Sequence, residues 1–204
     1  PDLVIALDRG VQGAVGVMLN QGNAGFPSAP IDYPVTGSAT RVTIADLNRD
    51  GRADLAVSTV LRVVSVLINQ GDGVFPQISP SYSPGGIVQQ LSAQDINGDG
   101  FVDLVMNTSV GTDPSGSVRV AFGDKDGSFS AVPWMPFPGV LADSVRAVDL
   151  SGDGSPDLVA IGRGSVDVLL YEGGGTFSAG ATFSASVKPD RLPSRNRMVL
   201  RSLR

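Results

Sequence analysis

Short apolar runs alternate with turn-rich polar segments along the whole chain. Within one stretch of about 50 residues, apolar strands are expected at 41–45, 55–60 and 62–69. A weaker strand is expected at 75–82, and it contains proline, which is tolerated only at the edge of a sheet. Glycine, aspartate and asparagine separate these runs. Short β-branched runs between turn residues predict an all-β protein.

The same pattern recurs at a period near 50 residues. One landmark is an aspartate followed by leucine, at Asp2, Asp54, Asp103 and Asp157, with spacings of 52, 49 and 54. A second is a glycine-rich turn leading to phenylalanine, at Phe26, Phe75, Phe129 and Phe177, with spacings of 49, 54 and 48. Four short strands in each such unit predict β-propeller blades, which are four-stranded antiparallel sheets. A β-sandwich is the alternative, but its strands would not carry one loop at a fixed period.

The landmarks divide the chain into a partial unit at 1–37 and full units near 38–86, 87–139 and 140–186. The first unit lacks its first strand and most of its loop, so about 3.75 blades are expected. We expect the true N-terminus to lie further upstream. The tail at 187–204 has no landmark and holds six of the 15 basic residues, so we expect it to be poorly ordered.

The clearest chemical signal is a loop between the first and second expected strands of each unit. It places oxygen-bearing side chains at positions 1, 3, 5 and 9, with glycine at position 6. The candidate ligands are Asp46, Asn48, Asp50 and Asp54 in the first loop, Asp95, Asn97, Asp99 and Asp103 in the second, and Asp149, Ser151, Asp153 and Asp157 in the third. Oxygen ligands around a sharp turn suit calcium, whereas magnesium prefers a tight octahedron with several waters.

Two simpler explanations for these loops fail. An EF-hand needs a glutamate at position 12, where this chain has Val57, Met106 and Ala160. Plain Asp-Gly hairpin turns would not explain the aspartates at positions 1 and 9. Nine of the 20 acidic residues lie in the three loops, and such crowding is repulsive without a counter-ion. We therefore expect one calcium ion in each complete loop, three in all.

The loops have the form Asp-x-[Asn/Ser]-x-Asp-Gly-x-x-Asp-Leu. Together with the glycine-turn-phenylalanine landmarks, they make residues 1 to about 186 resemble the FG-GAP/VCBS repeat class. That class builds the integrin alpha-subunit propeller and many bacterial surface proteins. The resemblance implies loops that bind calcium between the first two strands of a blade, with backbone carbonyls at position 7 (Arg52, Phe101 and Ser155) as further ligands. It also implies that the chain is part of a larger, commonly seven-bladed propeller.

Composition excludes several classes of site and partner. The chain has no cysteine and no histidine, which excludes disulfide scaffolds, Cys/His zinc sites and imidazole-based triads. The net charge is −5. Because six of the basic residues lie in the tail, the rest of the chain is strongly acidic, which argues against a nucleic-acid partner. No apolar run approaches the roughly 18 residues of a membrane span.

These observations predict an extracellular (secreted or cell-surface), calcium-stabilised binding or adhesion module for a protein or glycan, without catalytic residues. The alternatives are a structural spacer of a larger surface protein and the propeller part of a polysaccharide-acting enzyme. We expect recognition on the loops opposite the calcium loops, which include the insertion at 111–116 and the segment 132–138. Trp134, the one tryptophan, is expected to pack between blades, and stacking on a sugar or contact with a protein partner is the alternative. The landmark phenylalanines are expected to pack between blades.

Overall fold

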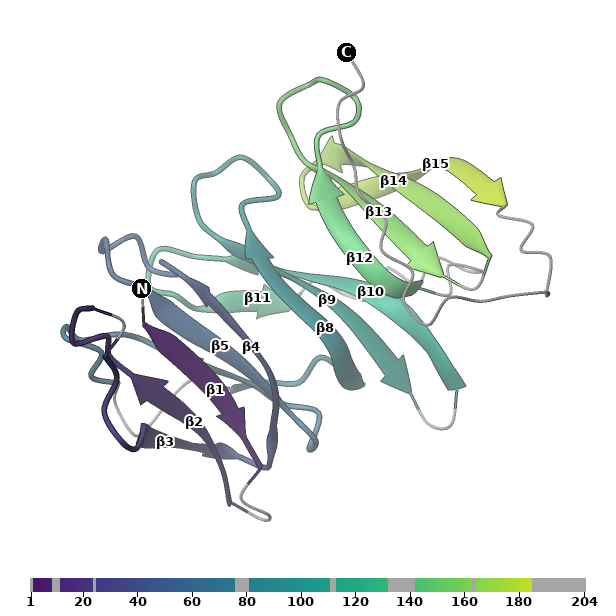
Figure 1. Cartoon of the computed structure of the whole chain (residues 1–204). Coiled ribbons are helices and arrows are strands. Elements are labelled where there is room, and N and C mark those ends of the chain that lie inside the picture. The colour runs from purple at the N-terminus through teal and green to yellow at the C-terminus, as the bar shows by residue number, and fades with distance from the viewer. Residues whose placement is uncertain are drawn as a thin grey trace.

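The computed structural model is an all-β structure of consecutive antiparallel sheets. It describes residues 2–8, 12–23, 25–75, 81–110, 113–131, 142–162 and 164–184, and these ranges contain 15 strands. The sheets follow one another in chain order, so the purple first sheet and the yellow-green last sheet lie at opposite ends of the molecule (Figure 1). None of the described residues form a helix long and apolar enough to cross a membrane.

The first two sheets are separate. The first contains β1 (Leu3–Leu7), β2 (Gln12–Met18) and β3 (Ile31–Thr36), in that order. The second contains β4 (Ala39–Ala45), β5 (Asp54–Thr59), β6 (Val64–Leu67) and β7 (Ser81–Tyr82), also in sequence order. Every neighbouring pair is antiparallel. Such up-and-down order is the arrangement of a propeller blade.

The next two sheets are joined. The third blade contains β8 (Ile87–Gln94), β9 (Asp103–Val110), β10 (Asp113–Gly123) and β11 (Phe129–Ala131). The fourth contains β12 (Ala142–Val148), β13 (Asp157–Gly162), β14 (Ser165–Gly173) and β15 (Thr176–Ser184). One backbone pairing, Gly116 with Ala142, connects β10 to β12 and makes one eight-stranded sheet. The predicted all-β fold of blade-like antiparallel sheets is confirmed, and the sheets described do not close into a ring.

Two local predictions differ from the structure, and a third lies largely outside the described residues. β6 is shorter than the expected run 62–69, because Arg62 adopts a φ of 60° in the turn after β5 and donates its N–H to Thr59 O. Of the expected strand 75–82, residues 76–80 lie outside the described ranges. The expected loop insertion at 111–116 is wrong in part, since the backbone from residue 113 onward belongs to β10. The segment 132–138 and the tail also lie outside the described residues.

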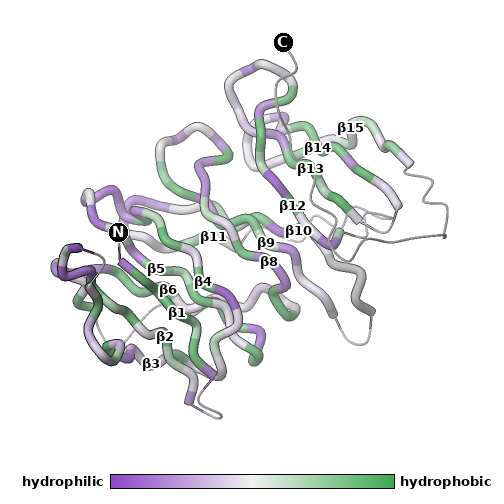
Figure 2. Tube along the Cα trace, in the orientation of Figure 1, coloured by the Kyte–Doolittle hydropathy of each residue, from purple (hydrophilic) through white to green (hydrophobic). Residues whose placement is uncertain are grey.

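Among the residues that the structure describes, the hydrophobic core forms three clusters, and each lies between consecutive blades. Strands of the first and second blades share one that includes Val15, Val17, Leu55 and Val57. The second and third blades share another, with Leu47, Val66, Leu104 and Met106. Ile96 and Val105 of the third blade pack with Val145 and Leu169 of the fourth. In Figure 2 the hydrophobic stretches run along the strands, while many connecting loops are hydrophilic. Burial of apolar area between blades therefore stabilises the array.

Two aromatic pairs pack across the interfaces between consecutive blades. Phe75 packs edge-on against Tyr33 of the preceding blade, with ring centroids 5.1 Å apart, and Tyr33 Oη donates to Gly73 O at 2.8 Å. Phe129 packs in the same way against Tyr82, at 5.6 Å, and its N–H donates to Tyr82 Oη at 2.8 Å. The expectation of packing between blades is confirmed for these two phenylalanines.

The other two landmark phenylalanines differ. Phe177 is buried in the cluster between the third and fourth blades, but its ring partner, Tyr171, belongs to its own blade. Phe26 is only half-buried. The landmark position therefore faces the core more closely in the last three blades than in the first.

Replacing Phe75 with alanine is expected to destabilise the protein by about 3–5 kcal/mol, because it removes a buried ring from an interface between blades. The measurement is the midpoint of urea unfolding. Phe183→Ala is the matched control, since that ring is 58% exposed, and its effect is expected to stay within about 0.5 kcal/mol. Equal losses in the two variants would contradict the proposed role of the interface.

Candidate functional site

The three candidate loops occupy the same place in their blades. Each joins the first strand of a complete blade to the second: 46–54 connects β4 to β5, 95–103 connects β8 to β9, and 149–157 connects β12 to β13. The ninth residue of each loop is also the first residue of the second strand. The sequence repeat therefore places each set of acidic side chains at the same end of its blade.

All three loops have one backbone shape, held by their own side chains. The aspartate at position 1 accepts the N–H of the glycine at position 6, at 2.8 Å for Asp46, 2.9 Å for Asp95 and 3.0 Å for Asp149. The aspartate at position 5 accepts the N–H of position 7 in every loop, at distances of 2.7–2.9 Å. The position-6 glycines have φ values of 84°, 86° and 92°, which strongly favour glycine.

The ninth aspartate is buried and ties its loop to the third strand of the blade. Oδ2 of Asp103 accepts the N–H of Ile96 inside the loop, and Oδ1 accepts the N–H of Gly123, at the end of β10; both distances are 2.8 Å. Asp54 and Asp157 repeat this arrangement, with Leu47 and Asn69 and with Leu150 and Tyr171 as donors. All three aspartates are fully buried.

The first, partial unit retains one half of this arrangement. The N–H of Asn20, just after β2, donates to Oδ1 of Asp2 at 2.8 Å. Asp2 therefore matches the ninth loop position, as its place in the sequence repeat predicts. The strand donors escaped the sequence analysis, although a signal was present: Asn20, Asn69, Gly123 and Tyr171 each lie six residues before a landmark phenylalanine.

Burial makes the charge on the ninth aspartate costly. It raises the pKa of Asp103 to about 6; the N–H groups of Gly123 and Ile96 oppose the shift, and the charges of Asp99 and Asp95 add to it. The pKa of Asp54 is raised for the same reasons. For Asp157, burial also pushes the pKa upward, but backbone N–H donors, led by that of Tyr171, outweigh it and lower the pKa. A cation beside Asp54 or Asp103 would relieve this cost.

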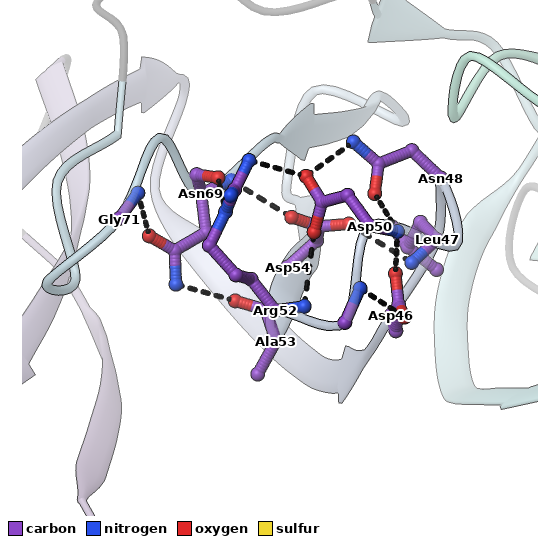
Figure 3. Close-up of polar contacts among 10 residues, drawn as sticks. Asp46, Leu47, Asn48, Asp50, Arg52, Ala53, Asp54, Asn69 and Gly71 are labelled. Carbon is purple, nitrogen blue, oxygen red and sulfur yellow. Dashed lines mark hydrogen bonds and ion pairs between the residues drawn. The ribbon is translucent and has the colours of Figure 1, made fainter.

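The first loop differs from the other two because it carries its own cation. The guanidinium of Arg52, at position 7, lies with Nη2 2.6 Å from Oδ2 of Asp50 and donates from Nε to Asn69 O at 2.9 Å (Figure 3). Asn48 Nδ2 donates to the same Asp50 oxygen at 2.9 Å. The pKa of Asp50 is lowered, first by the Asn48 amide and further by the backbone N–H and the guanidinium of Arg52, while desolvation opposes the shift.

The donor set fits a hard cation in its chemistry. Each loop offers three carboxylates and one amide or hydroxyl oxygen, which are the ligands that calcium prefers. Among the described residues, however, no three acidic side chains are gathered closely enough to hold a metal ion as they stand. The carboxylates accept backbone N–H groups instead, and each oxygen keeps a second lone pair for another contact. The loop side chains would therefore have to converge further around an ion.

Neighbouring loops also contact each other. The guanidinium of Arg49, in the first loop, lies over the ring of Phe101 in the second, 5.2 Å from its centroid. Arg49 takes a φ of 60°, at the position where the other loops have Gly98 and Gly152. The contact joins the loop ends of the second and third blades.

In buffer free of divalent cations, the protein is expected to lose stability as pH rises from about 4 to about 7. The folded state holds the Asp103 proton up to a pKa of about 6, whereas the unfolded chain releases it near 3.8, so the loss is on the order of 3 kcal/mol. Urea unfolding at several pH values measures it. Asp103→Asn is expected to flatten this dependence, and an unchanged slope in that variant would refute the assignment.

The chain is similar to a known repeat family. The model of the FG-GAP-like repeat family matches residues 1–57 and 95–160, which contain all three loops and parts of every blade. No curated protein matches the chain significantly. A solved structure of an Agrocybe aegerita lectin that recognises non-reducing terminal N-acetylglucosamine is similar in fold.

The similarity to that lectin has a TM-score of 0.51 at 20% sequence identity and covers 90% of this chain. The chain spans about half the length of the lectin, 52% of which is covered. At this identity the similarity concerns the fold. The family match covers more than half of the residues and includes all three loops entirely. The chain therefore belongs to the FG-GAP-like repeat family.

Proposed function

We propose that this chain is a non-catalytic, extracellular recognition module: a set of propeller blades stabilised by calcium that binds a glycan. The observation that carries the proposal is the threefold repetition of one oxygen-rich loop in one backbone shape. The lectin similarity supports a glycan in preference to the protein ligand that the sequence also allows.

Calcium would act on stability. The position-1, 3, 5 and 9 side chains of each loop would hold it, with the position-7 carbonyl, and its charge would offset the buried ninth carboxylate. An ion that binds the folded loop better than the unfolded chain stabilises the fold by mass action. Affinities on the order of 10⁻⁴–10⁻³ M are usual for extracellular calcium modules, which fits the proposed location. The first loop should bind most weakly, because Arg52 already supplies a positive charge to Asp50.

The alternative of a polysaccharide-acting enzyme needs a pair of acids outside the loops. Asp167 is buried and already committed to two hydroxyls: Thr182 Oγ1 donates to Oδ1 at 2.7 Å, and Ser165 Oγ donates to Oδ2 at 3.0 Å. Asp143 is exposed on β12. Neither residue has the setting of a general acid with a carboxylate partner across a substrate. These placements support a binding role.

Excess chelator is expected to lower the melting temperature, and calcium at about 100 times its Kd should add about 2.7 kcal/mol of stability per site. Calorimetric titration should find one fewer ion per chain in Asp99→Ala. Asp143→Ala removes an exposed carboxylate outside the loops and serves as the control. A melting curve that is identical with and without chelator would contradict the proposed stabilisation by calcium.

Glycan recognition is tested on an array of neutral and acidic oligosaccharides, with calcium held at millimolar concentration. We expect saturable binding to one or more neutral structures and no release of reducing ends from bound polysaccharides. Absence of binding by the folded protein would favour the structural spacer. Release of reducing ends would favour the enzyme.

A further inference from the structure

The third blade lacks a side chain at one position of its loop end where the second and fourth blades have one. The strand residue whose N–H reaches the ninth aspartate is Asn69 in the second blade, where Nδ2 donates to Ala53 O at 3.0 Å and Oδ1 accepts from Gly71 N at 2.9 Å. Tyr171 in the fourth blade accepts from Gly175 N through its hydroxyl. In the third blade this residue is Gly123, and a Cβ there would lie 2.2 Å from Val102 O.

The residue at loop position 7 makes a second difference. In the second blade the side chain of Arg52 spans from Asp50 in the loop to Asn69 O at the end of β6 (Figure 3). The corresponding residue of the third blade is Phe101, which has no polar group to make that bridge. With neither an Asn69 nor an Arg52 side chain, the space between the loop and the β10–β11 turn is left open.

An open cavity lies in this space. Its volume of about 450 Å³ is typical of ligand pockets. Phe101 and Asp99 line it from the loop, and Phe122, Asp124, Ser128 and Ser130 line it from the end of β10 and the turn that follows. Phe101 and Phe122 are half-buried, whereas Asp124 and Ser130 are exposed at the opening. Phe122 also faces the next blade, since a Cβ on Gly175 would lie 2.8 Å from its ring.

The lining combines two kinds of surface. Three phenylalanine rings, those of Phe101, Phe122 and Phe129, offer apolar contact, and the guanidinium of Arg49 covers one face of the first. Two carboxylates and two serine hydroxyls place oxygen atoms that can accept hydrogen bonds around these rings. A sugar ring has the matching surfaces, with C–H groups on its faces and hydroxyls on its rim. The carboxylates of Asp99, Asp124 and Asp126 outnumber the two nearby cations, Lys125 and the Arg49 guanidinium over the Phe101 ring, so the net charge around the cavity disfavours an anionic ligand.

We propose that this cavity at the loop end of the third blade binds one neutral sugar residue of a glycan. The proposal rests on the proposed glycan-binding function and names its site. It also relocates recognition, which the sequence placed on the opposite ends of the blades. Those connections, at 111–112 and 132–141, lie outside the described residues.

The test fills the cavity with the kind of side chain that occupies the same place in the second blade, an arginine. Phe101→Arg places at position 7 the residue that bridges loop and strand in the second blade, so the fold should tolerate it. Ser155→Arg makes the same change at the equivalent position of the fourth blade and is the matched control. Asp124→Ala removes a polar group of the lining, and Gln70→Ala is its counterpart in the second blade.

Binding is measured by ¹H–¹⁵N chemical-shift titration of the whole chain in fixed calcium with N-acetylglucosamine, galactose, mannose, glucosamine and N-acetylneuraminic acid. We expect at least one neutral sugar to shift residues 99–101 and 122–130. Phe101→Arg and Asp124→Ala should each lower the affinity for that sugar by about tenfold or more, and the two control variants should lower it by less than about twofold. Melting curves confirm that each variant is folded.

The outcomes separate this site from the general function. If the array finds a glycan that the Phe101→Arg and Asp124→Ala variants still bind normally, this site is wrong and the glycan-binding function stands. If no sugar on the array or in the titration binds, both fail. Tighter binding of glucosamine than of every neutral sugar would mark a cation site, and preference for N-acetylneuraminic acid would contradict the charge argument.

Discussion

Each of the last three blades depends on one buried carboxylate that accepts two backbone N–H groups. The ninth aspartate receives one N–H from its own loop and one from the end of the third strand, so a single side chain connects three parts of the blade. A buried carboxylate without these donors would be strongly unfavourable. The two hydrogen bonds make the position tolerable, and the raised pKa of Asp103 shows that they do not fully offset the loss of water.

The interfaces between blades rely on different physics. Apolar strand residues supply most of the buried area, and the three clusters each draw on two consecutive blades. The Tyr33–Phe75 and Tyr82–Phe129 pairs restrict the orientation of one blade relative to the next, because each tyrosine hydroxyl also forms a hydrogen bond with the backbone of the following blade. Non-directional burial thus holds the blades together, while the aromatic pairs set how one blade meets the next.

Function is expected where the repeats differ within this common frame. Arg52 and Asn69 fill the loop end of the second blade, and Tyr171 occupies that of the fourth. In the third blade Phe101 and Gly123 replace them and a cavity opens. Two substitutions in a repeat can therefore create a pocket without disturbing the loop, because the ninth aspartate bonds to the backbone N–H and not to the side chain of its strand partner.

The repeat, the all-β class and the positions of the loops could be predicted from the sequence, because alternating apolar runs and Asp-Gly turns act locally. The sequence also indicated the oxygen-rich donor set and the packing role of Phe75 and Phe129. The contacts that the aspartates make became visible in the folded chain, since the partners of Asp103 include Gly123, 20 residues away. The tertiary structure alone placed Arg49 of one loop over Phe101 of the next, and a cavity between a loop and a turn. Such contacts join distant segments, and no local pattern records the space that is left between them.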